Sequence, residues 1–376
     1  MNNLVMISAN TAWNLASRNR LIQAIKDTGR EVIAMAAPDS TAAKLEATSG
    51  ITFIPLPMKS DSTNILEDIA LFFTYIRLYR KYRPSIALHL NNKPNIYGSL
   101  AASLCGIKSV ANITGLGIVA EKKGFTRFLV HFLYKIAFFS RKTHVFFQNT
   151  DDREYFYQNN LVKPERTGLI PGSGVDTEAF SPDTSISASS EDIRFIYIGR
   201  LVLSKGIRLY IEAARNVKLL CKNVKFTIIG ENVAGNSAFL PSIELEEAIR
   251  DTIVEYHGSV DDVKPYIAAA DCVVSPSWYR EGVPRVLLEA ASMGKPLIAA
   301  DSVGTREPVE DGINGFLIPP RDRDALQNVM IRFINAPSDE KRRMGLESRR
   351  IAMTRFSVSF VIDMYLAQLP AIMTDN

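Results

Sequence analysis

Two glutamates separated by a proline form the most informative chemical pattern in this sequence. Glu281 and Glu289 lie eight positions apart, with Pro284 between them. A helix that starts at Pro284 would leave Glu281 in the preceding loop and place Glu289 about one and a half turns in. Two carboxylates held in this way can bind hydroxyl groups at two ends of an elongated ligand, and the N–H groups of the helix start suit a diphosphate between them. Taken alone, the pattern also fits two solvated glutamates on an amphipathic helix.

Two cations follow a different apolar run. Arg200 and Lys205 lie in the segment IGRLVLSKG, directly after a predicted strand over residues 194–198. Gly199 permits a close turn, so both side chains can project from the end of that strand. A bidentate guanidinium and an ammonium group can neutralise a departing diphosphate. The alternative is a solvated basic loop.

The elements that position these residues follow from alternating apolar and amphipathic runs, which predict βαβ units in parallel sheets. In the first half, we expect strands over residues 4–8, 31–36, 85–90, 109–113 and 144–148, and helices over 16–27, 65–82, 96–104 and 125–141. In the second half, we expect strands over 194–198, 225–230, 254–257, 272–275 and 296–300, and helices over 207–219, 244–251, 263–269 and 284–293. Two more helices, over 341–355 and 357–369, close the chain.

The predicted fold class is α/β, with two Rossmann-like, doubly wound parallel-sheet domains facing a cleft. A polar segment with almost no aliphatic periodicity, residues 181–192, separates the halves. We therefore expect an acceptor-binding domain over residues 1–178, a linker over 179–192, and a donor-binding domain over 193–356. The helix in 357–376 is expected to cross back and pack on the first domain. Ligands of open α/β sheets bind at the carboxyl ends of the strands.

Composition narrows the class of protein. The 376 residues are 47% hydrophobic and 22% charged, which is typical of a globular protein and excludes disorder. The three cysteines are scattered, as in a cytoplasmic protein, and no signal peptide or membrane span is evident. Residues 1–180 carry 21 Lys+Arg against 14 Asp+Glu, and the remainder carries 23 against 26. The basic first half is expected to face an anionic partner, but not a nucleic acid.

Four segments resemble those of retaining glycosyltransferases of the GT-B fold, family 4 type, the E-x7-E group. GRLVLSKG resembles their G-R-x-x-x-x-K-G segment, and EGVPRVLLEA resembles their E-x7-E element. MGKPLIAADSVGTREPVEDGINGFLIPPRD is similar to the segment that follows that element, and GSGVDTEAFSP to their interdomain stretch. The four segments occur in the order found in the family.

This resemblance implies a donor site for a UDP-sugar. Glu281 would contact the donor sugar, beside the backbone of Gly282, Val283 and Pro284, and Glu289 would bind the ribose hydroxyls. The resemblance further implies that the reaction retains the anomeric configuration and needs neither metal nor cofactor.

The same resemblance implies three catalytic residues, Glu281, Arg200 and Lys205. The two cations would bind the donor diphosphate and stabilise it as it leaves. The four histidines form no pair at metal-ligand spacing, in keeping with a reaction that uses no metal.

The first half is similar to a bacterial subgroup that extends undecaprenyl-diphosphate-linked saccharides, such as N-acetylgalactosaminyltransferases of glycan assembly. The AWN segment, NNKPNIYGSLAA and the TGLG turn carry this resemblance. It implies five acceptor-side residues: Trp13, Asn14, Asn92, Thr114 and Gly115. A histidine found in better-known family members is absent here. Oxygens of the departing phosphate are therefore expected to take the acceptor proton, with electrostatic stabilisation supplying most of the catalysis.

A basic, aromatic-rich segment over residues 122–142 contains no acid and has the character of an interfacial helix. Lys122, Lys123 and Arg127 are its candidate membrane contacts. We therefore expect a cytoplasmic protein peripherally associated with the inner face of the plasma membrane. The alternative is a core helix with solvated lysines.

The predicted function is transfer of a sugar, an N-acetylhexosamine, from a UDP-sugar to a lipid-linked saccharide in bacterial surface-polysaccharide (O-antigen or capsule) or glycan assembly. Two alternatives of other classes are a sugar-nucleotide 2-epimerase of the same fold and a non-catalytic scaffold of glycan assembly. An NAD-dependent enzyme is excluded because no Gly-x-Gly-x-x-Gly follows a first strand.

Overall fold

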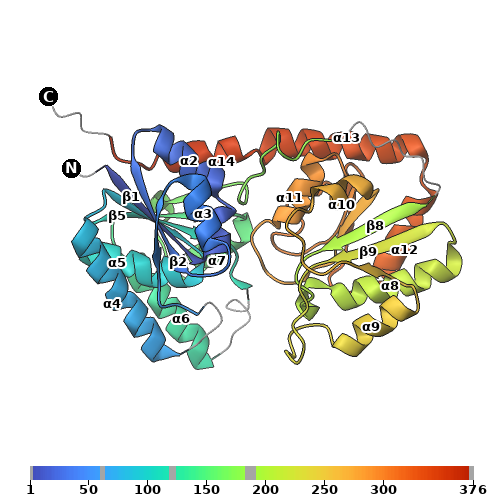
Figure 1. Cartoon of the computed structure of the whole chain (residues 1–376), viewed down its shortest axis with the longest axis horizontal. Coiled ribbons are helices and arrows are strands. Elements are labelled where there is room, and N and C mark those ends of the chain that lie inside the picture. Colours follow the sequence, from blue (N-terminus) through green and yellow to red (C-terminus); the bar gives the residue numbers. More distant parts are fainter. Residues whose placement is uncertain (1–2, 60–63, 118–123, 183–191, 372–376) are drawn as a thin grey trace. The chain divides into compact units, whose positions relative to one another are not determined.

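The computed structural model describes residues 3–59, 64–117, 124–182 and 192–371, which form two compact units (Figure 1). Unit 1 comprises Met1–Ser173 and Val358–Asn376, and unit 2 comprises Gly174–Ser357. The division therefore lies a few residues before position 178, the expected end of the first domain. Phe180, from the expected linker, packs against a core cluster of unit 2, whereas residues 183–191 lie outside the described ranges.

Unit 1 contains a seven-stranded sheet in the order β3-β2-β1-β4-β5-β6-β7, and all its pairings are parallel. Its strands are β1 (Leu4–Thr11), β2 (Glu31–Ala37), β3 (Thr52–Pro55), β4 (Ile86–Leu90), β5 (Lys108–Ile113), β6 (Thr143–Phe147) and β7 (Thr167–Leu169). Central strands such as β1 and β4 are buried on both faces, so they read as continuous apolar runs.

Helices cover both faces of this sheet. They are α1 (Ala12–Ala16), α2 (Asn19–Asp27), α3 (Ala42–Ser49), α4 (Ile65–Tyr82), the π-helical turn η1 (Pro94–Gly98), α5 (Ser99–Leu104), α6 (Gly124–Ala137), α7 (Thr150–Gln158), the 3-10 turn η3 (Pro164–Arg166) and α14 (Val358–Leu366). Apolar residues of α1, α2, α3 and α14 pack on one face, and those of α4 and α5 pack on the other.

Unit 2 repeats this plan with six parallel strands in the order β10-β9-β8-β11-β12-β13. They are β8 (Ile193–Ile198), β9 (Val224–Ile229), β10 (Glu255–Tyr256), β11 (Cys272–Ser275), β12 (Leu297–Ala300) and β13 (Gly315–Ile318). The helices are the 3-10 turn η4 (Leu203–Lys205), α8 (Ile207–Leu220), α9 (Ser242–Arg250), α10 (Lys264–Ala269), α11 (Arg285–Ser292), α12 (Arg323–Asn335) and α13 (Ser338–Arg355). Residues of α8, α9 and α12 pack in one core cluster and those of α10 and α11 in another, and α13 contributes to both, with Met344 in the first and Ile351 and Ala352 in the second.

Both sheets have a topological switch point, where consecutive crossovers run in opposite directions from a central strand. It lies between β1 and β4 in unit 1 and between β8 and β11 in unit 2. Ligands of doubly wound sheets bind beyond the carboxyl ends of the strands at such points. The predicted α/β fold is confirmed, and α14 returns to unit 1, where it packs on α2.

Candidate functional site

The basic loop of unit 2 leaves the switch point at the end of β8 and is fixed by its neighbours. The hydroxyl of buried Tyr197 donates to the carbonyl of Arg200 over 3.1 Å. The N–H of Leu201 donates to the Glu231 carbonyl, and the N–H of Leu203 to the Ala238 carbonyl. Segment 231–241 therefore supports this loop along its length. The Arg200 residue itself is exposed.

Lys205 and Glu281, which come from the two predicted motifs, form an ion pair. Their Nζ and Oε2 atoms are 2.7 Å apart, and the side chains are only 24% and 15% exposed. Ser277 Oγ donates to the other carboxylate oxygen of Glu281 over 3.0 Å. The N–H groups of Trp278 and Tyr279 both donate to the Ser204 carbonyl, which joins the loop after β11 to the loop after β8.

Two glycines allow these loops to approach each other. A Cβ atom on Gly206 would lie 2.3 Å from the Pro276 carbonyl oxygen. One on Gly304 would lie 2.2 Å from the carbonyl oxygens of both Glu281 and Gly282. Both glycines also have positive φ angles, which disfavour other residues. The backbone that carries Lys205 and Glu281 is therefore packed too closely for any larger side chain.

Helix α11 carries the second predicted carboxylate. It begins at Arg285, not at Pro284 as expected, because Pro284 is the N-cap residue with extended ψ. Glu289 is 8% exposed, and its Oε1 accepts from an Nη of Arg285 over 2.9 Å. Burial raises the pKa of Glu289, and the Arg285 cation partly offsets that rise. Glu289 is therefore a buried carboxylate with a cationic partner and not a solvated one.

The predicted acceptor-side residues gather at the switch point of unit 1. The side chain of Asn91, at the end of β4, donates to Thr114 Oγ1 and accepts from the N–H of Asn10, each over 3.3 Å. Trp13 follows β1 and is 57% exposed. The Tyr134 hydroxyl donates to Asn92 Oδ1 over 3.4 Å.

The two remaining acceptor-side residues belong to the same strand ends. The N–H of Asn14 donates to Thr11 Oγ1 at the start of α1, and Gly115, just after Thr114, has a φ of 109°. The five predicted residues therefore follow β1, β4 and β5, which are adjacent in the sheet.

Four residues of these clusters were not predicted: Ser277, Arg285, Asn10 and Asn91. Each lies within four positions of a predicted site residue, and this proximity in sequence is the one signal that could have identified it. Ser277 and Arg285 bond to residues four positions along the chain, whereas Asn10 and Asn91 bond between distant segments, which no spacing reveals.

The predicted membrane residues are only partly described. Lys122 and Lys123 lie outside the described ranges. Arg127 lies with its guanidinium 5.8 Å from the centre of the Tyr155 ring, and it also donates to Asn159 Oδ1. This side chain therefore packs along α7. None of the described helices is long and apolar enough to cross a membrane.

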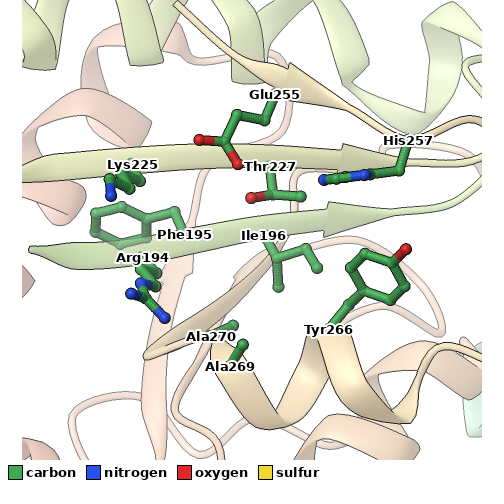
Figure 2. A pocket seen from close by; sticks show the side chains of 10 residues that line it. All are labelled: Arg194, Phe195, Ile196, Lys225, Thr227, Glu255, His257, Tyr266, Ala269 and Ala270. Atoms are coloured by element: carbon green, nitrogen blue, oxygen red, sulfur yellow. The ribbon is translucent and has the colours of Figure 1, made fainter. Parts of the chain in front are cut away.

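A separate pocket of about 210 Å³ lies in unit 2, between the β8–β10 edge of the sheet and α10. In Figure 2, Arg194, Ile196, Lys225, Thr227 and Glu255 project from the strands, and Tyr266 faces them from α10. No predicted site residue lines this pocket. In the described part of the chain, no cluster of three or more His, Cys, Asp or Glu side chains could hold a metal ion.

Comparison with known proteins extends these observations. Residues 192–336 match the family model "Glycosyl transferases group 1". The chain is 25% identical over 347 residues, 88% of each chain, to the N,N'-diacetylbacillosaminyl-diphospho-undecaprenol alpha-1,3-N-acetylgalactosaminyltransferase of Campylobacter jejuni. It is 26% identical over 291 residues to the UDP-Gal:alpha-D-GlcNAc-diphosphoundecaprenol alpha-1,3-galactosyltransferase of Escherichia coli. This match covers 74% of the present chain and 73% of the Escherichia coli enzyme.

Solved structures share the fold. A glycosyltransferase from Rickettsia africae superposes with a TM-score of 0.78 at 17% identity, covering 97% of both chains. HepE of Anabaena in complex with UDP-glucose gives a TM-score of 0.78 at 20% identity, covering 97% of this chain and 98% of that chain. The chain is therefore a glycosyltransferase of the GT-B fold, in which residues 192–336 form a domain of the glycosyl transferases group 1 family.

Proposed function

We propose that this enzyme transfers a sugar, an N-acetylhexosamine, from a UDP-sugar to a lipid-linked saccharide. The reaction retains the configuration at the anomeric carbon and needs no metal. The observation that carries the proposal is the ion pair between Lys205 and Glu281, which joins the two donor motifs at the switch point of unit 2.

Each donor-site residue has a distinct task in this proposal. Lys205 and Arg200 bind the diphosphate, and the N–H groups at the start of α11 lie in the same segment as Glu281. Glu289 accepts hydrogen bonds from the ribose hydroxyls, and Glu281 contacts the donor sugar beside the backbone of residues 282–284.

Chemistry then needs no covalent intermediate on the protein. The bond from the anomeric carbon to the diphosphate breaks, and the bond to the acceptor oxygen forms on the same face of the sugar. The acceptor proton passes to an oxygen of the departing phosphate. The cations stabilise the charge that develops on that phosphate, which is usually the largest catalytic contribution.

The named relatives support the proposed acceptor class. The Campylobacter and Escherichia enzymes act on saccharides linked to diphospho-undecaprenol, and a further relative of Staphylococcus aureus is a capsular polysaccharide biosynthesis glycosyltransferase. We extend this class to the present chain and assign acceptor binding to Trp13, Asn14, Asn92, Thr114 and Gly115. Bacterial surface-polysaccharide or glycan assembly is the corresponding process.

The donor site is tested by Lys205→Ala and Glu289→Ala. Each should lower transfer by at least 100-fold, on the order of 3 kcal/mol of transition-state stabilisation, while the melting temperature changes little. Lys225→Ala is the matched control because Lys225 is a paired lysine of the same unit, bound to Asp192 at 2.9 Å. Full activity of either donor-site variant would exclude this donor site.

The same assay separates the alternative of another class. The wild-type enzyme is incubated with UDP-N-acetylhexosamines, with and without a panel of polyprenyl-diphosphate-linked saccharides. A transferase releases UDP in step with acceptor elongation. Epimerised sugar without acceptor would instead indicate a 2-epimerase.

We also propose that unit 1 docks peripherally on an anionic membrane surface. Helix α4 exposes Ile65, Leu66 and Phe73, and α6 exposes Phe128 and Phe132, whose rings are stacked. Both helices contact α5 (Figure 1). Exposed aromatic and aliphatic side chains on helices of a basic unit are typical of interfacial docking.

Vesicle co-sedimentation tests the docking surface. Phe128→Ser with Phe132→Ser should reduce binding to vesicles that contain phosphatidylglycerol by several-fold. Leu219→Ser with Leu220→Ser is the control, because these two side chains are exposed to a similar degree in unit 2. Equal binding of the two double variants would contradict the assignment.

A further inference from the structure

We propose that Asn91 is a positioning residue that holds the acceptor-binding loops of unit 1 in register. The inference rests on the proposed function, since it assumes that these loops bind the saccharide acceptor. Asn91 itself need not touch the acceptor.

The side chain of Asn91 connects three adjacent strand ends. Asn91 follows β4, its Oδ1 accepts the N–H of Asn10 from β1, and its Nδ2 donates to Thr114 Oγ1 just after β5. At Asn10 the pairing register of β1 with β2 is interrupted between Ser8 and Thr11. Such bulges re-aim side chains next to active sites. One amide group therefore fixes the loop that leads to Trp13 and the turn that contains Gly115.

The backbone of Asn91 is adapted to this task. Its φ is 72°, in the left-handed region that asparagine tolerates better than most residues. The Asn91 carbonyl accepts the N–H of Asn95, the second residue of the π-helical turn η1. Short π-helical segments of this kind occur frequently at functional sites.

The residues that follow Asn91 anchor it to the helices behind the loops. Asn92 accepts from Tyr134 of α6, and Lys93 forms a 2.8 Å ion pair with Asp68 of α4, in which both side chains are largely buried. These contacts with α6 and α4 fix the loop after β4. The hydrogen bonds of the Asn91 side chain then fix the ends of β1 and β5 relative to that loop. The left-handed backbone directs this side chain toward the neighbouring strand ends.

The groups that Asn91 gathers suit an uncharged saccharide. They are amides, a hydroxyl and an exposed indole, and in the described part of the chain the Oδ1 atom of Asn10 is buried without a hydrogen-bond partner. Neutral donors and acceptors beside an aromatic ring match sugar hydroxyls better than a phosphate.

Three variants distinguish the effect of the Asn91 side-chain amide from that of its left-handed backbone. Asn91→Gly keeps the positive φ and removes both hydrogen bonds, whereas Asn91→Asp keeps the acceptor for the Asn10 N–H and loses the donor to Thr114. Asn160→Gly is the matched control, because Asn160 is also left-handed, with a φ of 51°, in unit 1. Transfer is measured on the polyprenyl-diphosphate-linked saccharide that the wild-type enzyme uses, with donor and acceptor concentrations varied in turn.

We expect Asn91→Gly to raise the acceptor KM about tenfold, the order of magnitude of two lost hydrogen bonds, with the donor KM unchanged. Asn91→Asp should lie between it and the wild type, and Asn160→Gly should match the wild type. Hydrogen exchange supplies a second readout that needs no acceptor. The Asn10 amide should exchange faster in Asn91→Gly and remain protected in Asn91→Asp.

An unchanged acceptor KM in Asn91→Gly, or an unchanged exchange rate at Asn10, overturns the proposal. An equal rise in donor KM would also do so, because the donor residues lie in unit 2. A wild-type enzyme without turnover on any lipid-linked saccharide would instead count against the proposed function, and the exchange readout would still decide the role of Asn91.

Discussion

Single glycines and carboxylates decide the geometry of the proposed donor site. The carboxylate of Glu281 is positioned by Lys205 and Ser277, each of which bonds to one of its oxygens. Gly304 leaves room for the carbonyl oxygens of Glu281 and Gly282. Burial limits the solvent contacts of the Glu289 carboxylate, and Arg285 favours its charged form. The position and the charge of the two carboxylates are therefore set by their near neighbours.

Gly304→Ala tests the close approach at the donor loop. The new Cβ would meet two carbonyl oxygens at 2.2 Å, at a φ of 84°, so the loop that carries Glu281 must shift. We expect a loss of about 1–3 kcal/mol in the free energy of unfolding and a fall in kcat/KM of more than tenfold. Both quantities are measured on the purified variant.

The control for Gly304→Ala is Gly312→Ala. Gly312 has a similar φ of 73°, but a Cβ there would meet nothing within 4 Å. It isolates backbone strain, so its activity should stay close to that of the wild type. If both variants lose activity equally, the close approach at Gly304 is not what positions Glu281.

At the scale of elements, polar side chains inside unit 1 tie helices to strands. Buried His89 of β4 hydrogen-bonds to the Tyr79 hydroxyl of α4 at 2.7 Å and to the Ser99 hydroxyl of α5 at 3.0 Å. Burial lowers the pKa of His89 to about 3, so the imidazole is neutral in the folded protein at ordinary pH. Strand β4 therefore leads to the proposed acceptor loops with both helices fixed to it.

This histidine gives unit 1 a defined pH dependence. The folded pKa lies below the unfolded value of about 6.5, so its contribution to stability is complete above that pH and is lost as the pH falls toward 3. Between pH 7.5 and pH 5 the loss should be about 2 kcal/mol. Urea unfolding of wild type and His89→Gln at the two pH values measures it. The variant should lose less stability on acidification, and an equal loss in both proteins would contradict this account.

How far the sequence predicts these elements depends on their length and neighbours. The segments that became α4 and α8 were predictable from their apolar period, and those that became β1 and β4 from their continuous apolar runs. Strands β3, β7 and β13 were missed because three or four residues, TFIP, TGL and GFLI, carry too little pattern. Helix α12 was also missed, although Asp322 caps it by accepting from the N–H of Ala325.

The candidate site shows the same limit. Resemblance supplied Lys205 and Glu281, and the structure adds that they touch. The contribution of Arg285 depends on the i,i+4 spacing of a helix whose start was placed one residue early. Asn91 could not be assigned, because its partners Asn10 and Thr114 are distant in sequence.

At the scale of the whole molecule, unit 1 is discontinuous and is completed by α14. Val361 and Tyr365 of this helix are buried in a core cluster of unit 1. The side chain of Asn112 donates to the Tyr365 hydroxyl, and the Lys108 ammonium donates to the Gln368 carbonyl. Residues 358–371 are therefore part of the core and not an appendage.

Removal of residues 358–376 should destabilise unit 1 selectively. The truncation uncovers the apolar face that receives Val361 and Tyr365, which costs several kcal/mol at the usual value per buried side chain. Calorimetry should show one transition moved to lower temperature, and the UDP binding proposed for unit 2 should be retained. Tyr365→Phe is the milder companion, since it removes only the hydroxyl that meets Asn112. If the truncated chain keeps all its transitions, α14 is dispensable.

The discontinuity of unit 1 has a consequence for biosynthesis. A ribosome releases strands β1 to β7 first, but the helix that completes their core comes only after all of unit 2 has been made. At about 5–20 residues per second this delay is on the order of ten seconds or more. During this delay, the nascent first unit exposes the apolar patch that α14 will later cover. A chaperone could bind at this patch. The unit translated second can fold first.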